Sequence, residues 1–224
     1  MVCLCVCFRF YLSGFVGLLL VLTAEARVGN SSELDFCSET DECCLFDLIC
    51  RTDDYEVRHY DSVSWVSTNE SSLIMEVANM RAFRRLFTYI NGTNENPAFF
   101  IDVLVLLKSL FFNRDPGTYT MSFLLPSKHQ KNPPKPTDDR VYIETIPDMK
   151  VYVRSYGGWM LKIRDQSQAE ALTTDLNSVG AKYKRNFHYA VGYNSPMTMF
   201  NRHNEVWYVV EDEPVCTSSE ELDS

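Results

Sequence analysis

Residues 55–92 read YEVRHYDSVSWVSTNESSLIMEVANMRAFRRLFTYING, and this stretch contains two kinds of periodicity. The segment at 55–60 alternates in residue type and the segment at 65–68 is aromatic and β-branched, so both are predicted to be strands. From residue 73 onward, apolar side chains recur every three or four positions, which predicts a helix that Gly92 can end. The apolar face of this helix consists of Leu73, Val77, Met80, Phe83, Phe87 and Ile90.

The second half of the chain repeats this pattern. Its predicted strands are residues 141–144, 149–156, 187–193 and 205–211. Between the second and third of them, SQAEALTTDLNSVG at residues 167–180 predicts a helix. In that helix Ser167 and Glu170 have capping-box spacing, and Gly180 marks the end. The sequence therefore predicts an α+β domain with two helices, built from two pseudo-repeated halves.

The first 26 residues, MVCLCVCFRFYLSGFVGLLLVLTAEA, have the features of a secretory signal peptide. Arg9 precedes an apolar run at residues 15–22, and the small-residue pattern from Ala24 to Ala26 follows it. A membrane anchor is the alternative, but that run is shorter than the roughly 20 apolar residues that a spanning helix needs. We therefore expect cleavage after Ala26, no stable membrane span, and a secreted, extracellular protein.

Cysteine usage also favours an oxidising compartment. Of the eight cysteines, those at positions 3, 5 and 7 lie in the predicted signal peptide. The five that remain are Cys37, Cys43, Cys44, Cys50 and Cys216. They are expected to be mostly disulfide-bonded, with one thiol left over because the number is odd. Cys216 could link the two ends of the domain, although the pairing cannot be derived from sequence. A zinc site is the alternative for the first four, but they lack a CxxC pair and a nearby histidine.

The charge of the chain argues against nucleic acid as a partner. The formal net charge is −9, and the sequence has no cluster of lysine and arginine residues. Affinity for nucleic acid depends largely on such clusters, because they displace counterions from the phosphates. The acidic segment at 214–224 is predicted to be a frayed tail.

Three N-x-S/T patterns are candidate N-glycosylation sites in an exported chain. They are at Asn30, Asn69 and Asn91. Each would have to face solvent. Asn91 stands next to Gly92 at the predicted end of the first helix, which makes it the most favourable position of the three.

Several long blocks of the sequence resemble the SOUL or haem-binding protein family. They are YEVRHYDSVSWVST, LPSKHQKNPPKPTDDRVYIE, MKVYVRSYGGW and AVGYNSPMTMFNRHNEVWYV, and they keep order and spacing over roughly residues 55–213. The resemblance implies a twisted antiparallel β-sheet, shaped as a distorted barrel, with two helices. It also implies binding of haem or a related tetrapyrrole. The chain then divides into a signal peptide (1–26), a cysteine-rich segment (27–54), the haem-binding domain (55–213) and the acidic tail.

The resemblance suggests where a tetrapyrrole would bind. In similar proteins the histidine of the Y-E-x-R-H-Y motif is a suggested axial ligand of haem iron, and here it is His59. A strand histidine can equally be a packed or solvent-facing side chain. The family's apolar contacts come largely from the first helix, which here offers Met80, Phe83 and Phe87 with Arg84 beside them. The alternative is that this Met and Phe stripe belongs to the core.

One segment departs from the family pattern and keeps a second function open. Residues 99–123, FFIDVLVLLKSLFFNRDPGTYTMSF, lack the Thr and Pro that relatives carry there, and a buried strand pair is the default reading. The first hypothesis is a secreted haem or tetrapyrrole binder acting as a carrier, scavenger or buffer. The alternative is a module that binds another apolar ligand or a protein partner, whose identity the sequence does not reveal. We do not expect an enzyme, because the sequence contains no recognisable nucleophile and base set, metalloprotease motif or phosphate loop.

Overall fold

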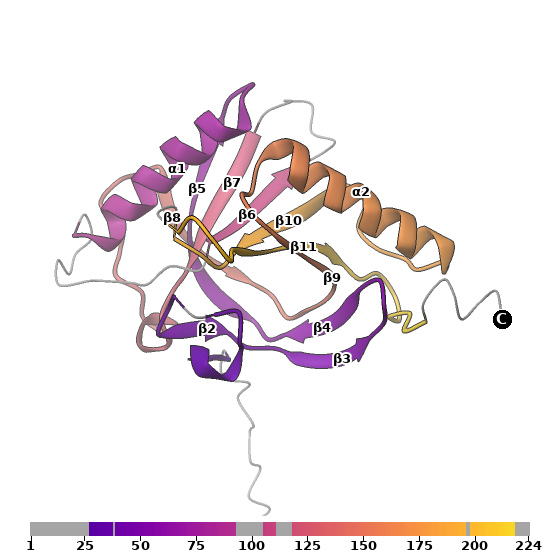
Figure 1. Cartoon of the computed structure of the whole chain (residues 1–224). Helices are drawn as coiled ribbons and strands as arrows, with labels where there is room; N and C mark the ends of the chain where they lie inside the picture. Colours follow the sequence, from indigo (N-terminus) through magenta and orange to yellow (C-terminus); the bar gives the residue numbers. More distant parts are fainter. Residues whose placement is uncertain (1–26, 38, 93–104, 111–117, 196–197, 218–224) are drawn as a thin grey trace, which may run out of the picture.

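A computed structural model describes residues 27–37, 39–92, 105–110, 118–195 and 198–217, with residues 105–110 described by their backbone. The predicted signal peptide lies outside the described residues. The described part is dominated by one antiparallel sheet (Figure 1). In sheet order its nine strands are β3 (Asp47–Arg51), β4 (Glu56–Tyr60), β9 (Met149–Gly157), β11 (His203–Val209), β10 (Phe187–Gly192), β6 (Val105–Leu110), β7 (Thr118–Leu124), β5 (Val63–Ser71) and β8 (Val141–Ile146).

Two helices cover one face of this twisted sheet, which confirms the predicted α+β class. Helix α1 (Met75–Ile90) lies against β5 and β7, and α2 (Lys162–Ser178) lies against β9 and β11 (Figure 1). Strands β10 and β11 have side chains buried on both faces, because the helices cover one face and an apolar cluster fills the other. That cluster is centred on Tyr60, Trp65 and Trp207.

The predicted barrel is wrong, because the sheet of the described residues has two edges, β3 and β8. The β4–β9 ladder ends where Tyr60 pairs with Met149, and the β5–β8 ladder begins where Val63 pairs with Ile146. Pro147, which has no amide hydrogen to donate, lies between the two ladders and interrupts the pairing. We call this break, at residues 61–62 and 147–148, the corner of the sheet.

The helix predictions were correct in position and partly wrong in detail. Helix α1 ends just before Gly92, which has a positive φ of 122°. Helix α2 begins at Lys162, so the predicted capping box is wrong: Ser167 lies inside the helix and its hydroxyl donates to the carbonyl of Arg164. Its predicted end is confirmed, since Gly180 adopts a φ of 69°, which glycine tolerates best.

The remaining elements are short and lie around the sheet. They are β1 (Val28–Asn30), β2 (Glu42–Cys44) and the 3₁₀ turns η1 (Ser31–Glu33) and η2 (Ser127–His129). Strands β1 and β2 pair with each other, and Glu39 fastens this N-terminal segment to the β10–β11 loop. It does so by accepting hydrogen bonds from the amide of Ser195 and the hydroxyl of Thr198.

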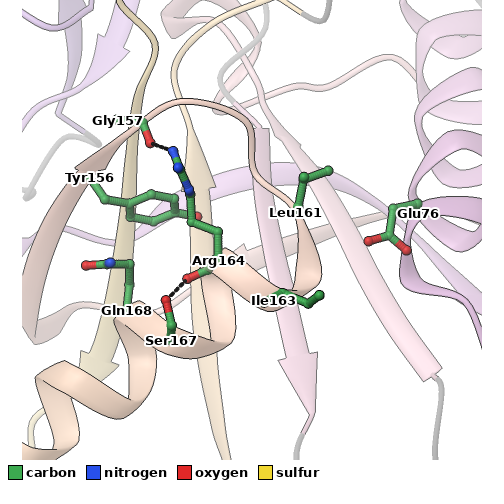
Figure 2. Close-up of a pocket in the computed structure, with 8 residues that line it drawn as sticks. All are labelled: Glu76, Tyr156, Gly157, Leu161, Ile163, Arg164, Ser167 and Gln168. Carbon is green, nitrogen blue, oxygen red and sulfur yellow. Dashed lines mark hydrogen bonds between the residues drawn. The ribbon is translucent and has the colours of Figure 1, made fainter.

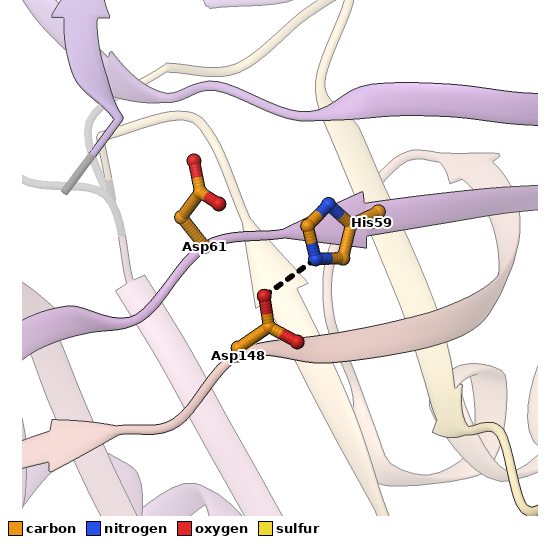
Figure 3. A group of neighbouring side chains, drawn as sticks. All are labelled: His59, Asp61 and Asp148. Atoms are coloured by element: carbon orange, nitrogen blue, oxygen red, sulfur yellow. Dashed lines mark hydrogen bonds and ion pairs between the residues drawn. The ribbon is translucent and has the colours of Figure 1, made fainter. Parts of the chain in front are cut away.

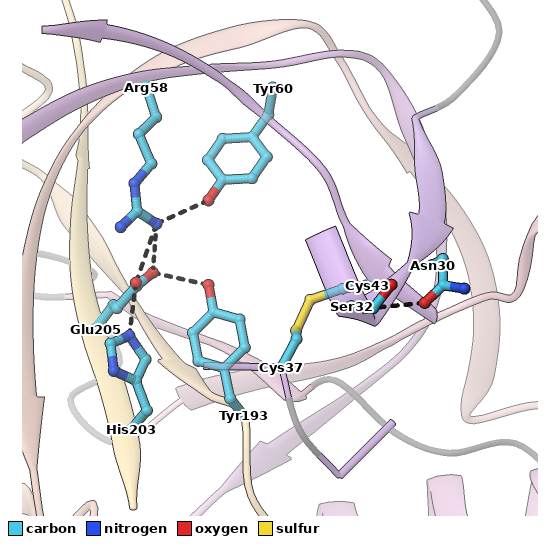
Figure 4. The surroundings of a disulfide bond; sticks show 9 residues. All are labelled: Asn30, Ser32, Cys37, Cys43, Arg58, Tyr60, Tyr193, His203 and Glu205. Atoms are coloured by element: carbon cyan, nitrogen blue, oxygen red, sulfur yellow. Dashed lines mark hydrogen bonds and ion pairs between the residues drawn. A yellow bond between two sulfur atoms is a disulfide. The ribbon is translucent and has the colours of Figure 1, made fainter. Parts of the chain in front are cut away.

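Two disulfides tie down the N-terminal segment. Cys50 is bonded to Cys216, so Cys216 links the two ends of the domain, a pairing that the sequence left open. Cys37 is bonded to Cys43, which leaves Cys44 as the free thiol (Figure 4). Burial raises the pKa of the Cys44 thiol to about 12. The two disulfides therefore hold the cysteine-rich segment against one end of the core. The first four cysteines do not form the alternative zinc site, because three of them are disulfide-bonded.

The atypical segment contributes two neighbouring strands to the sheet, as predicted. Strand β6 pairs with β7 on one side and with β10 on the other, and Tyr119, Met121 and Phe123 of β7 are buried. The rest of that segment lies outside the described residues. From β4 onward, the order two strands, helix, two strands occurs twice in the described residues. Duplication of the halves remains a prediction. No helix in the described part of the chain is both long enough and apolar enough to cross a bilayer.

Candidate functional site

The outer face of α1 carries the predicted Met and Phe stripe. Met80 and Phe87 are 50% and 49% exposed, and Phe83 is partly buried between them and the sheet. The rings of Phe83 and Phe87 are stacked with centroids 5.8 Å apart. The edge of Phe83 also meets Phe123 of β7 at 5.4 Å. The stripe is thus a half-exposed apolar surface held in place by contact with the sheet.

The face of α1 that packs on the sheet is a different one from that predicted. Of the six residues predicted to share a face, Ile90 alone is buried, and Leu73 is 86% exposed. The buried positions are Met75, Ala78, Ala82, Leu86, Tyr89 and Ile90. Two small alanines allow the helix backbone to approach the sheet closely, so the larger Met80 and Phe87 remain outside. Met80 and Phe87 therefore lie outside the core, whereas Phe83 packs against it, so the alternative that the stripe belongs to the core holds for Phe83 alone among the three.

Arginine side chains flank the stripe, and they fall into two groups. Arg85 forms an ion pair with Glu70 and donates to Thr68, so its charge is already satisfied. Arg81 and Arg84 are exposed and form no ion pair with any residue the structure describes. Two unpaired guanidinium groups beside an apolar surface can accept carboxylates from a ligand.

A shallow pocket of about 560 Å³ lies on this arginine side of α1. It is lined by Glu70, Arg81, Arg84, Arg85, Thr88, Thr137, Asp138 and Arg140. Hydrogen bonds from Arg140 lower the pKa of Asp138 to about 2, so this pair is fixed and charged. The free positive charge in the pocket therefore comes from Arg81 and Arg84.

His59 is on a different part of the sheet from this stripe. Strand β4 lies between β3 and β9, whereas α1 lies against β5 and β7 (Figure 1). The Nε2 atom of His59 is 2.6 Å from a carboxylate oxygen of Asp148, and Nδ1 is 3.8 Å from Asp47. Both ring nitrogens therefore face carboxylates. The structure brings Met80, Phe83, Arg84 and Phe87 together and does not place His59 with them.

Two of the other histidines, His188 and His203, are held by acidic partners. The Nε2 atom of His188 is 2.8 Å from Asp165, and both side chains are buried. The Nε2 atom of His203 is 2.9 Å from Glu205, and the ring of Phe36 stacks on the imidazole at 4.5 Å. These contacts explain both histidines as structural residues.

Glu205 is the centre of a buried polar network that the sequence did not indicate (Figure 4). Its carboxylate accepts hydrogen bonds from Arg58, Tyr193 and Trp207. Burial alone would raise the pKa of Glu205, but the charge of Arg58 and the contacts with His203 and Tyr193 together outweigh burial and lower this pKa to about 2. The network therefore links β4 and β11 with Tyr193, which directly follows β10.

A second pocket, of about 760 Å³, lies where the first turns of α1 and α2 meet (Figure 2). Leu161 and Ile163 form its apolar wall, and Glu76 reaches it from α1. Tyr156 lies on another wall, where burial and the charge of Asp165 raise the pKa of its hydroxyl. This pocket was not predicted from the sequence, because the predicted helix at 167–180 begins five residues after the first residue of α2, Lys162. The sequence does contain one indication of the pocket. Apolar and basic residues alternate at 161–164, and all four are exposed in the structure.

The predicted glycosylation positions are all exposed. Asn30 caps η1 by accepting a hydrogen bond from the amide of Ser32 (Figure 4). The oxygen of the Asn69 side chain accepts from Thr120, and the amide of Asn91 donates to the carbonyl of Phe87. Exposure is compatible with modification, and modification itself remains a prediction.

The chain belongs to the SOUL family, since the family model described as SOUL heme-binding protein matches residues 41–209. Heme-binding protein 2 of Homo sapiens is 35% identical over 167 residues, which cover 71% of this chain and 80% of that protein. Heme-binding protein 1 of Bos taurus is 29% identical, over 71% of this chain and 84% of that protein. The resemblance inferred from sequence is confirmed.

Solved structures extend the likeness of the fold beyond this family. The EcmrR C-terminal domain superposes with a TM-score of 0.54 and 8% identity, over 75% of this chain and 99% of that one. At such low identity the likeness concerns the fold alone.

Proposed function

We propose that the protein binds haem or a related tetrapyrrole on the outer face of α1. The observation that carries this proposal is the half-exposed stripe of Met80, Phe83 and Phe87 beside two unpaired arginines. A tetrapyrrole is flat and apolar with two carboxylates at one edge. Stacked rings and a thioether can contact its face, while Arg81 and Arg84 can pair with its propionates. The relatives named heme-binding protein 1 and 2 support this choice of ligand.

This mode of binding does not use His59 as an axial ligand. His59 would have to leave Asp148, and it is on a strand away from α1. We therefore infer that the propionates and the ring face supply most of the affinity. The role is one of binding rather than catalysis.

A hemin titration of residues 27–224, followed at the Soret band, tests the proposal. Replacing both Met80→Ser and Phe87→Ser should weaken binding at least tenfold, which corresponds to about 1.4 kcal/mol of lost contact. His59→Ala should leave the affinity within about twofold. Ile163→Ser, an exposed apolar residue on the other helix, is the matched control. Equal affinity for all four proteins would contradict the proposed surface, and loss of the Soret shift in His59→Ala would restore that residue as a ligand.

We also propose that the protein is exported and acts as an extracellular carrier or buffer of its ligand. Support comes from the apolar N-terminus that ends in Ala24-Glu25-Ala26 and from two disulfides in the folded domain. N-terminal sequencing of protein recovered from the medium of expressing cells should begin at Arg27. Treatment with an N-glycosidase should reduce its mass if Asn30, Asn69 or Asn91 is modified. Retention of an uncleaved chain inside the cells would contradict export.

The pocket between the two helices favours a second candidate, binding of a different small apolar ligand. Leu161 and Ile163 are 52% and 84% exposed there, and Arg164 and Glu76 supply polar groups at the rim. Ile163→Ser would then lower affinity for a fluorescent apolar probe, while Phe87→Ser would not. The reverse result would assign the apolar binding to the α1 stripe alone.

A further inference from the structure

The corner of the sheet places three potential metal ligands side by side. Tyr60 pairs with Met149 at the last step of the β4–β9 ladder, so Asp61 and Asp148 follow directly on opposite strands. His59 points to the same place (Figure 3). One ligand atom from each of His59, Asp61 and Asp148 lies within 4.8 Å of the others.

We propose that His59, Asp61 and Asp148 bind a divalent transition-metal ion of the Zn²⁺ class. Zn²⁺ takes imidazole nitrogen and carboxylate oxygen at about 2.0–2.2 Å, which puts the ligand atoms of a tetrahedral site about 3.3 Å apart. The three side chains need to adjust by small rotations to reach this spacing. The β4–β9 ladder, which ends at Tyr60 and Met149, fixes the backbone next to Asp61 and Asp148.

The accessibility of the cluster suits an ion that enters from solvent. The side chains of His59 and Asp148 are 27% and 65% exposed. An ion can therefore reach the ligands without opening the core. With three protein ligands, water or a small anion completes the fourth position.

A third carboxylate stands where metal sites commonly have a supporting group. Asp47 Oδ2 lies 3.8 Å from Nδ1 of His59, on the side of the ring opposite to Asp148. Asp47 is itself held by an ion pair with Arg27. A carboxylate at the second ring nitrogen fixes the orientation and tautomer of a metal-bound imidazole, and this arrangement recurs in zinc sites. Asp47, at 3.8 Å, is the side chain placed to take this role.

The donor set selects the class of ion. One imidazole nitrogen and two carboxylates suit Zn²⁺, Ni²⁺ or Cu²⁺, whereas Ca²⁺ and Mg²⁺ prefer sites made entirely of oxygen. The contact of 2.6 Å between His59 and Asp148 is broken on binding, and each group bonds to the ion instead. Because a ligating imidazole must be neutral, any proton held in that contact passes to solvent.

Calorimetric titration of the EDTA-treated protein, residues 27–224, with Zn²⁺ tests this site in the absence of haem. A parallel titration with Co²⁺ reports the ligands through its visible absorption. We expect one-to-one binding in the wild type, and at least tenfold weaker binding in both His59→Ala and Asp148→Asn. Asp53→Asn, which removes an exposed carboxylate from another loop, is the matched control and should bind like the wild type.

The far-ultraviolet circular dichroism of each variant shows whether it is folded, so weaker binding cannot be mistaken for unfolding. Absence of saturable Zn²⁺ binding in the wild type would overturn the proposal. Unchanged affinity in His59→Ala would do the same, because it would place the ion elsewhere. A Ca²⁺ titration as strong as that with Zn²⁺ would contradict the assigned class of ion. Because no haem is present, these outcomes do not depend on the proposed haem surface.

Discussion

The guanidinium of Arg58 and the carboxylate of Glu205 lie 3.0 Å apart inside the sheet, with side chains that are 2% and 0% exposed. They come from β4 and β11 and are 147 residues apart in the sequence. The rings of Phe46 and Phe36 lie 4.1 Å and 5.4 Å from the guanidinium carbon. The N-terminal segment therefore shields the ion pair from water, and the pair fastens the strand that carries His59 to the centre of the sheet.

Glu205→Gln is expected to destabilise the protein by about 3 kcal/mol, because it removes the fully buried carboxylate that pairs with Arg58 and leaves the partly exposed Glu56 as its remaining partner. The matched control is Asp175→Asn, which breaks the more exposed pair of Arg154 and Asp175. The control substitution should lower the free energy of unfolding by no more than about 1 kcal/mol. Urea unfolding followed by tryptophan fluorescence gives both values. Similar losses in the two variants would mean that burial of the Arg58 pair adds little.

The same pair predicts how stability depends on pH. The pKa of Glu205 is lowered from 4.5 to about 2, so its charged form is favoured in the folded state. Its contribution is fully present above the pKa of the unfolded chain and is lost as pH falls from about 4.5 towards about 2. The stability difference between wild type and Glu205→Gln should therefore shrink over this range in unfolding experiments. A difference that stays constant from pH 7 to pH 2 would contradict the assignment.

The two disulfides should differ in how much they stabilise the fold. Cys50 and Cys216 close a loop of 166 residues, and Cys37 and Cys43 close one of 6. In the chain-entropy model these loops correspond to about 5 and about 2 kcal/mol. Replacing both cysteines of a pair by serine avoids a new free thiol. In thermal unfolding, the melting temperature should fall further for the Cys50 and Cys216 double variant than for the Cys37 and Cys43 double variant. The opposite order would be inconsistent with the chain-entropy model.

Cys44 should behave as a masked thiol. It is fully buried, and burial raises its pKa to about 12, so very little thiolate is present at neutral pH. A colorimetric thiol reagent should detect almost no reactive cysteine in the folded protein from residue 27 onward, and one per chain in denaturant without reductant. More than one thiol in denaturant would show that a predicted disulfide is absent.

The sequence predicted where the helices and strands lie better than which of their faces are buried. The spacing of apolar residues in 73–90 was sufficient to locate α1, because a helix requires only local periodicity. It could not reveal that the helix packs through Ala78 and Ala82, because that choice depends on how closely the backbone approaches β5 and β7. For that reason the exposure of Met80 and Phe87 could not be predicted from the sequence, and their place in a binding site remains a prediction.

Contacts between distant residues were beyond the reach of the sequence. The pairing of Arg58 with Glu205, and of His59 with Asp148, depends on strand register across 147 and 89 residues. Each chain segment looks like an ordinary strand or turn by itself. The link from Cys50 to Cys216 was anticipated in outline, because a cysteine near each end suits a domain whose ends meet. Pro147 was visible in the sequence, but its effect on barrel closure required the register of both ladders.

The proposed haem surface makes one further prediction, about the propionates. Replacing Arg81→Glu and Arg84→Glu together should weaken hemin binding at least tenfold, because two charge-assisted contacts become repulsive. The same variant should bind the dimethyl ester of haem as well as the wild type does, because the ester carries no carboxylates. Lys162→Glu, which reverses an exposed charge on the other helix, is the control. Soret titrations at low and high salt provide the measurement, and the difference between wild type and the double variant should decrease as salt screens the charges. If the ester lost affinity to the same extent as hemin, the arginines would be shaping the surface rather than pairing with the propionates.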